Sequence, residues 1–112
     1  MGPQPDPGGA GGGDVVSAPE ARFDALVHAP HRLQICAALD TVDQAEFALL
    51  RDSLGVSDSV LSKQVKALED AGYVKVSKGL VERRTRTWVA FTRSGRQAYR
   101  GHVAALRAMI GT

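Results

Sequence analysis

The apolar residues in the first half of the chain recur every three or four positions, which is the pattern of helices with one buried face. A short amphipathic piece over residues 21–27 comes first. Pro30 suits the first position of the next helix, where its missing N–H removes no hydrogen bond. Asp43 and Glu46 stand three residues apart, as in a capping box, and predict another helix with Asp43 as its N-cap.

A further helix is predicted after a turn of only three residues. Gly55 suits the left-handed conformation that ends one helix, and Ser57 is a good N-cap for the next, which ends at Gly72. Its predicted buried face holds Leu61, Val65 and Leu68. Its opposite side holds Ser59, Ser62, Lys63 and Lys66. Two helices joined by so short a turn form a helix-turn-helix in outline.

After Gly72 the apolar period changes to two, which indicates β-strands. Residues 73–78 and 87–91 alternate in this way. Residues 79–84 between them are mostly polar and include a glycine, which predicts an extended hairpin loop. The side chains expected to face the core are Val74, Val76, Val89 and Phe91.

Thr92 is a good N-cap for a final helix with an apolar stripe at spacings of three and four. The stripe comprises Ala98, Tyr99, His102, Val103, Leu106, Met109 and Ile110. The order of elements is therefore helix, helix, turn, helix, hairpin, helix. This order predicts an α+β, mostly helical fold, namely a winged helix-turn-helix domain with a two-stranded β-hairpin wing and a C-terminal helix.

Composition limits the domain organisation and the chemistry. The first thirteen residues hold six of the twelve glycines and three of the five prolines, so we expect residues 1–17 to be a disordered tail and residues 18–112 to be one domain. No apolar run is long enough to span a membrane, and no signal-peptide pattern is present, which predicts a cytoplasmic protein. The single cysteine, Cys36, is interpreted as a buried core thiol, with a thiol switch as the alternative. We expect no metal, no cofactor and no enzymatic activity, because no catalytic or ligand motif has the required spacing.

The net charge of +2 conceals an uneven distribution. Residues 1–50 carry a formal charge of −5, and residues 51–112 carry +7. From Gly72 onward there are nine cations and a single acid, Glu82. A solvated surface normally mixes both signs, so this segment indicates a polyanionic partner.

Three stretches together resemble a known family. "LSKQVKALEDAGYV", the basic hairpin "RRTRTWVAFT" and the "FTRSG" step are similar to winged-helix repressors related to MarR and ArsR, most closely to the small single-domain MarR-like group. The resemblance covers roughly residues 23–110. It implies a homodimer that binds pseudo-palindromic double-stranded DNA and represses transcription, and many such relatives respond to a small-molecule effector.

The resemblance also assigns positions to the interface. In the helix that enters the major groove, the DNA-facing positions are Ser57, Asp58, Ser59, Ser62, Lys63, Gln64 and Lys66, of which Gln64 lies near the buried face by angle. The wing positions, along the adjacent minor groove or backbone, are Lys78, Arg83, Arg84, Thr85 and Arg86. The dimerisation positions in the final helix are Tyr99, His102, Val103, Leu106, Met109 and Ile110.

Physical chemistry supports these roles but leaves alternatives. Lysine and arginine neutralise phosphates, and Lys63 and Lys66 are also suited to guanine edges. Asp58 either accepts from a cytosine amine or only caps its helix. Trp88 backs the hairpin, reaches DNA or lines the dimer seam. A second function is open as well: the domain is an interaction module whose basic wing binds an acidic protein or RNA.

Overall fold

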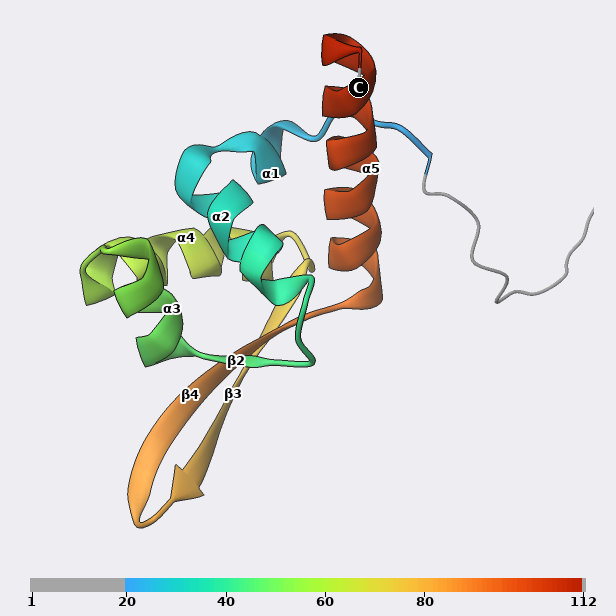
Figure 1. Cartoon of the computed structure of the whole chain (residues 1–112). Helices are drawn as coiled ribbons and strands as arrows, with labels where there is room; N and C mark the ends of the chain where they lie inside the picture. The colour runs from blue at the N-terminus through green and yellow to red at the C-terminus, as the bar shows by residue number, and fades with distance from the viewer. Residues whose placement is uncertain (1–19, 112) are drawn as a thin grey trace, which may run out of the picture.

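The computed structural model describes residues 20–111, and the predicted disordered tail over residues 1–17 lies outside the described residues (Figure 1). The helices are α1 (Ala25–His28), α2 (Pro30–Leu39), α3 (Phe47–Leu54), α4 (Asp58–Asp70) and α5 (Arg93–Ile110). The strands are β2 (Ala45–Glu46), β3 (Val74–Val81) and β4 (Arg84–Phe91). This order confirms the winged helix-turn-helix prediction. Among residues 20–111, no helix is long and apolar enough to cross a membrane.

The first helix is shorter than the amphipathic piece over residues 21–27 predicted. It begins after Asp24, whose side chain accepts a hydrogen bond from the Val27 N–H. The preceding residues are not helical, and the Arg22 N–H bonds instead to the carbonyl of Gly101 on α5. Contact with a distant helix therefore replaces the first turn that the local pattern favours.

The prediction of a capping box that begins at Asp43 is wrong. Ala45 and Glu46 form β2, which pairs with β4 so that Ala45 lies opposite Val89 and Glu46 lies opposite Trp88. The helix begins only at Phe47, with no side-chain cap. The sheet consequently has three strands in the order β2-β4-β3, rather than the two of the hairpin alone. Strand pairing with a segment about forty residues away outweighs the local capping signal.

The hairpin turn is also tighter than expected. The ladder of β3 and β4 continues to the Val81–Arg84 pair, so Glu82 and Arg83 alone form the turn. Both have positive φ, 51° and 67°, as a two-residue turn matched to the twist of the strands requires. Gly79, expected in the loop, lies within β3. The result is a long, narrow wing that projects from the helices (Figure 1).

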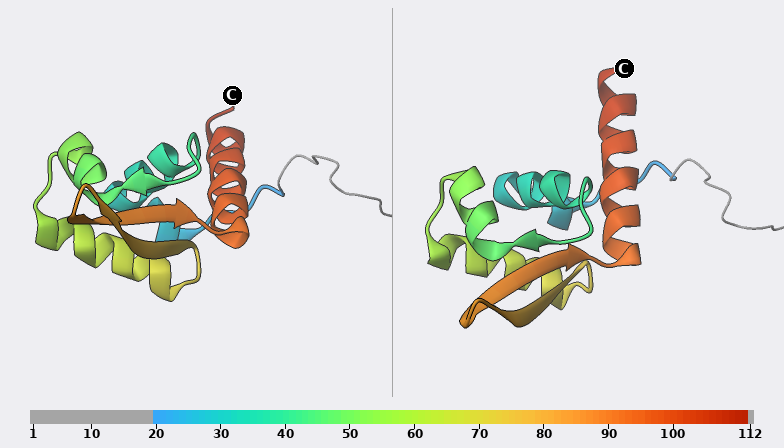
Figure 2. Two further views of the ribbon diagram at one scale, coloured as in Figure 1. Left: turned by 90° about the horizontal axis from the view of Figure 1, so that it is seen from below. Right: turned by 60° about the horizontal axis from the view of Figure 1, so that its bottom comes forward.

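The core lies between α2, α3, α4 and the base of the wing. It contains the residues predicted for α4 and the strands, with Val76 only half-buried at its edge. Its fully or nearly fully buried members are Val27, Ile35, Cys36, Leu39, Leu50, Leu61, Val65, Leu68, Val74, Val89 and Phe91. Helix α5 stands beside this core, and its C-terminal end extends past the other helices (Figure 2).

Two glycines permit α5 to pack this closely. A Cβ atom on Gly95 would lie 1.9 Å from the carbonyl oxygen of Tyr73, and one on Gly101 would lie 2.7 Å from the carbonyl oxygen of Glu20. Both distances are far below van der Waals contact. Glycine lowers the helix propensity of α5 at these two positions, but it permits close contact with the backbone of Tyr73 and Glu20.

Candidate nucleic-acid interface

The residues that the sequence predicted as helix ends and caps form the turn between α3 and α4. Gly55 ends α3 in the left-handed conformation, with φ of 69°. The Ser57 hydroxyl caps α4 by accepting a hydrogen bond from the Val60 N–H at 3.2 Å. The apolar face of α4 is buried in the core, which leaves the opposite face to solvent.

The exposed face of α4 contains six of the seven residues predicted to meet DNA. They are Ser57, Asp58, Ser59, Ser62, Lys63 and Lys66. Gln64 is the exception, because it is half-buried and its Oε1 accepts a hydrogen bond from Arg32 Nη1 at 2.9 Å. Arg32 also donates to the carbonyl of Leu26. Gln64 thus holds α4 against α2, and we remove it from the predicted DNA-facing set.

Two charged residues on this face already have partners. Asp58 binds Arg51 of α3 at 2.7 Å, and Lys66 binds Asp70 one turn further along α4 at 2.8 Å. The hydrogen bond to Asp70 raises the pKa of the Lys66 ammonium group. Such an exposed pair is weak in water, so Lys66 can exchange Asp70 for a phosphate. Lys63 takes part in none of the ion pairs found among residues 20–111.

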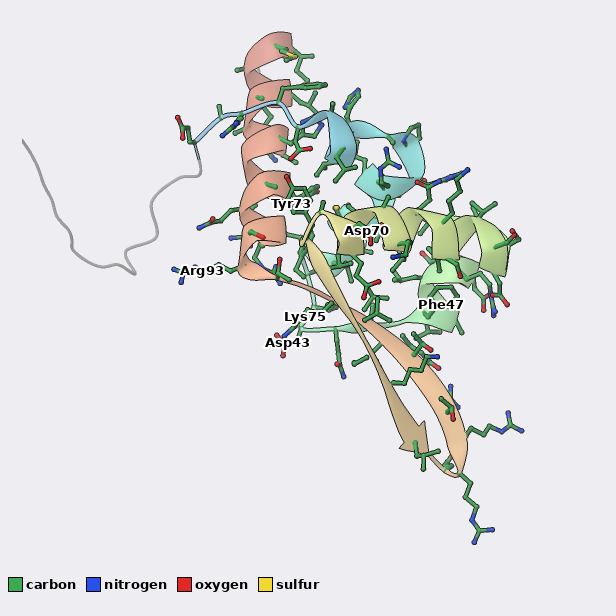
Figure 3. All side chains as sticks on the ribbon, turned by 180° about the vertical axis from the view of Figure 1, so that it is seen from behind. Asp43, Phe47, Asp70, Tyr73, Lys75 and Arg93 are labelled. Carbon is green, nitrogen blue, oxygen red and sulfur yellow. The ribbon has the colours of Figure 1, made fainter. Side chains whose placement is uncertain are left out.

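The wing tip is strongly basic and open to solvent. Lys78, Arg83, Arg84 and Thr85 are exposed, and within the described chain none of the three cations pairs with a carboxylate. Figure 3 shows nitrogen-tipped side chains extending from the hairpin tip. The tip and the start of α4 lie on the side of the molecule away from α5 in every view (Figures 1, 2 and 3).

Arg86 differs from the other wing cations. Its guanidinium group binds the carboxylate of Glu46 on β2, whose side chain is largely buried. Arg86 therefore fixes the wing to the third strand of the sheet. The sequence offered no local signal for this pair, because forty residues separate its members.

The apolar stripe of α5 divides into a packed part and an open part. Met109 and Ile110 are exposed, while Tyr99, Val103 and Leu106 are half-buried. His102 is completely buried, with its Nδ1 3.0 Å from the backbone nitrogen of Asp24 and its Nε2 3.0 Å from Nδ1 of His28. Its prediction as a dimerisation residue is therefore corrected: its side chain belongs to the interior of one copy.

The remaining candidates for chemistry lie away from this surface. Cys36 is a free, buried thiol, as the sequence predicted, and burial raises its pKa to about 12. Within residues 20–111 no three histidine, cysteine, aspartate or glutamate residues are grouped to hold a metal ion.

Comparison with known proteins agrees with the geometry. The family described as "Winged helix DNA-binding domain" matches residues 31–110. An uncharacterised protein of Methanocaldococcus jannaschii is 31% identical over 72 residues, which cover 64% of this chain and 78% of that protein. A transcriptional regulator homologue from Pyrococcus horikoshii has 28% identity and a TM-score of 0.73, over 77% of this chain and 85% of that one. YusO of Bacillus subtilis, at 16% identity, shares the fold with a TM-score of 0.69 over 77% of this chain and 60% of its own.

Proposed function

Because the chain belongs to the winged helix DNA-binding family, we propose that it is a transcriptional regulator that works by binding double-stranded DNA. The observation that carries the proposal is the set of uncompensated cations on the two elements that reach DNA in a winged helix. These cations are Lys63 on α4 and Lys78, Arg83 and Arg84 on the wing. Duplex DNA supplies the dense negative charge that they lack within the chain.

We assign different tasks to the two elements. Helix α4 enters the major groove, where Ser59, Ser62 and Lys63 read base edges and the exposed N-terminal turn donates backbone N–H groups to a phosphate. The wing follows the adjacent backbone and minor groove, where Arg83 and Arg84 add affinity with little sequence information. Asp58 stays paired with Arg51 in the first turn of α4, where the helix dipole favours a negative charge, because an acid adds no attraction for phosphate.

The protein acts as a homodimer on a pseudo-palindromic operator, and it represses transcription by occupying that site. The exposed apolar end of α5 supports the dimer: Met109 and Ile110 are 65% and 72% exposed, and Phe23 beside His102 is also exposed. A surface of this kind is costly in a monomer and useful between two copies. Two α4 helices related by a two-fold axis then read two half-sites.

The test is a salt titration of duplex binding. For the unchanged protein, log affinity falls steeply and linearly with log salt concentration, as several phosphate contacts require. The double variant Arg83→Ala/Arg84→Ala weakens binding to all duplexes and lowers the magnitude of the slope by about 2, or roughly 1 for each arginine that no longer neutralises a phosphate. Arg93→Ala is the matched control, since Arg93 is exposed at the base of α5 and points away from the wing (Figure 3).

Three kinds of result contradict the proposal or its assignment of charge to the wing. A flat salt response, or no duplex binding at low salt, excludes a duplex-binding regulator. Easy displacement of duplex DNA by single-stranded RNA or by an acidic protein favours the interaction-module alternative. A slope that changes equally in the Arg93→Ala control shows that the charge effect is not specific to the wing.

A further inference from the structure

The wing tip is apolar as well as basic. Leu80 is 75% exposed and Val81 is 39% exposed, just before the turn. They pair across the ribbon with Thr85 and Arg84, which leaves both apolar side chains without an apolar partner on the facing strand. A hairpin tip whose task was only to stay in solution, or only to attract phosphate, has no use for a large apolar residue at this position.

Other exposed apolar residues occupy different surroundings. Met109 and Ile110 belong to the open end of α5, and Leu49 stands alone on α3. Leu80 is an exposed leucine with three cations nearby in the hairpin: Lys78 lies two residues before it, and Arg83 and Arg84 follow the single acid of the turn, Glu82. An apolar protein surface is poorly matched by a tip with this charge. The minor groove of DNA matches it, because phosphates form its walls, the sugars that line it are apolar, and an unstacked base step exposes apolar base faces.

The dimensions of the wing restrict how it enters that groove. The minor groove is about 6 Å wide. Neighbouring strands are about 4.8 Å apart, and their side chains stand out on both faces. A two-stranded ribbon therefore enters an undistorted minor groove only by its tip. Leu80 and Val81, successive residues on one strand, then point toward opposite faces of the ribbon, so the tip carries apolar surface on both of its sides.

We propose that Leu80 is an apolar wedge that enters the minor groove and partly unstacks one base step, while Arg83 and Arg84 hold the flanking phosphates. The inference rests on the proposed function and assigns part of the sequence preference to the wing. Insertion of an apolar side chain costs least at pyrimidine–purine steps, which unstack most easily. The wing thus selects a TA or CA/TG step by deformability, without a hydrogen bond to a base.

The experiment uses duplexes selected by the full chain from random sequence, with the step beneath the wing changed from TA to AA. The unchanged protein binds the TA duplex about tenfold more tightly, which corresponds to about 1.4 kcal/mol and lies within the usual range for one altered base pair. Fluorescence energy transfer between labelled duplex ends shows a bend. Leu80→Thr, which keeps a β-compatible side chain and all charges, abolishes the preference and reduces the bend while leaving the salt slope unchanged. Leu49→Thr, the same change at an exposed leucine on α3 and away from the wing, is the control and retains both.

The outcomes separate the two claims. If Leu80→Thr keeps the TA preference and the bend, the wedge is overturned and the proposed function stands. If the unchanged protein binds these duplexes with a flat salt slope, or not at all, the proposed function fails and the wedge fails with it. Because the Leu80 side chain is mostly exposed, the substitution removes little core packing, and a circular dichroism spectrum equal to that of the unchanged protein confirms that the variant folds.

Discussion

The buried histidine between α5 and the first helix makes the stability of this protein sensitive to pH in a defined direction. His102 is 0% exposed, and its Nδ1 accepts a hydrogen bond from the backbone N–H of Asp24 at 3.0 Å. Nδ1 therefore carries no proton, and a neutral imidazole then has its proton on Nε2. That proton points to Nδ1 of His28, 3.0 Å away, so His28 accepts. Only a doubly neutral pair satisfies both hydrogen bonds.

Acidification breaks this arrangement at His102. A proton on its Nδ1 would face the Asp24 N–H, so two donors would oppose each other. Burial and the neighbouring His28 lower the pKa of His102, and the carboxylate of Asp24 opposes the shift only in part. Tyr73, which bonds to that carboxylate, stays protonated because this hydrogen bond raises its pKa to about 12.

The sign of the effect follows from linkage. In the unfolded chain a histidine has a pKa of about 6.5, which is above the lowered pKa of His102 in the folded protein. The stabilising contribution is therefore fully present above about pH 6.5 and is lost as the pH falls through that value toward the folded pKa. For a single histidine, proton linkage limits the loss between about pH 7.5 and pH 5.5 to about 1.4 kcal/mol, a tenfold change in the unfolding equilibrium. We expect the free energy of unfolding to fall by up to this amount before the carboxylates titrate.

Urea unfolding at fixed protein concentration and at several pH values measures this loss, since the midpoint reports stability when the slope is constant. His102→Asn is the informative variant. Its Oδ1 can still accept from the Asp24 N–H, and it does not titrate, so its midpoint depends less on pH in this range. His31→Asn is the control, because the His31 side chain makes no hydrogen bond among those found in residues 20–111, and we expect this variant to keep the pH dependence of the unchanged protein. Equal pH dependence in His102→Asn and the unchanged protein would refute the reasoning.

Two further predictions concern the packing and assembly of α5. Urea unfolding should show Gly95→Ala destabilised by more than about 1 kcal/mol, because its Cβ would lie 1.9 Å from the Tyr73 carbonyl oxygen. In the control Gly79→Ala, whose Cβ meets nothing within 4 Å, the free energy of unfolding changes little, and equal effects in both variants would show that α5 shifts freely. The double variant Met109→Ser/Ile110→Ser converts the proposed dimer into a folded monomer, as measured by light scattering. The control Leu49→Ser, at a residue on α3 that is 64% exposed, leaves the dimer intact. A double variant that stays dimeric places the interface elsewhere.

The sequence predicted those elements whose signals are local. Ser57, Thr92, Gly55 and Pro30 each have the cap or helix-end role that was read from the residue type, because a cap is formed within three or four residues. The apolar spacing of α4 placed its buried face correctly for the same reason. The exposed candidates on α4 then follow from the geometry of one helix.

Most of the failures involve distant partners. The capping-box pattern predicts Glu46 inside a helix that Asp43 caps, but pairing with β4 and the ion pair with Arg86 place Glu46 in a strand. His102 lies on the apolar stripe of α5 by spacing, yet the segment before α1 covers it and satisfies its ring nitrogen. The close approach of Gly95 on α5 to the Tyr73 carbonyl likewise has no signal in the local sequence. Periodicity shows which side of a helix is apolar, but it cannot show whether the same chain or a second copy covers that side.

Part of the charge asymmetry between the two halves of the sequence is neutralised by ion pairs within the fold. The acids of the first half neutralise some of the cations of the second: Asp40 binds both Arg96 and Arg100 on α5, and Glu46 on β2 binds Arg86 on β4. These pairs hold α5 and the sheet to the helical core and are not available to a partner. Lys63 on α4 and Lys78, Arg83 and Arg84 on the wing have no carboxylate partner among the described residues and lie away from α5. In the dimer that we propose, joined through the end of α5, these cations stay free, so the two proposed interfaces lie on opposite sides of the domain.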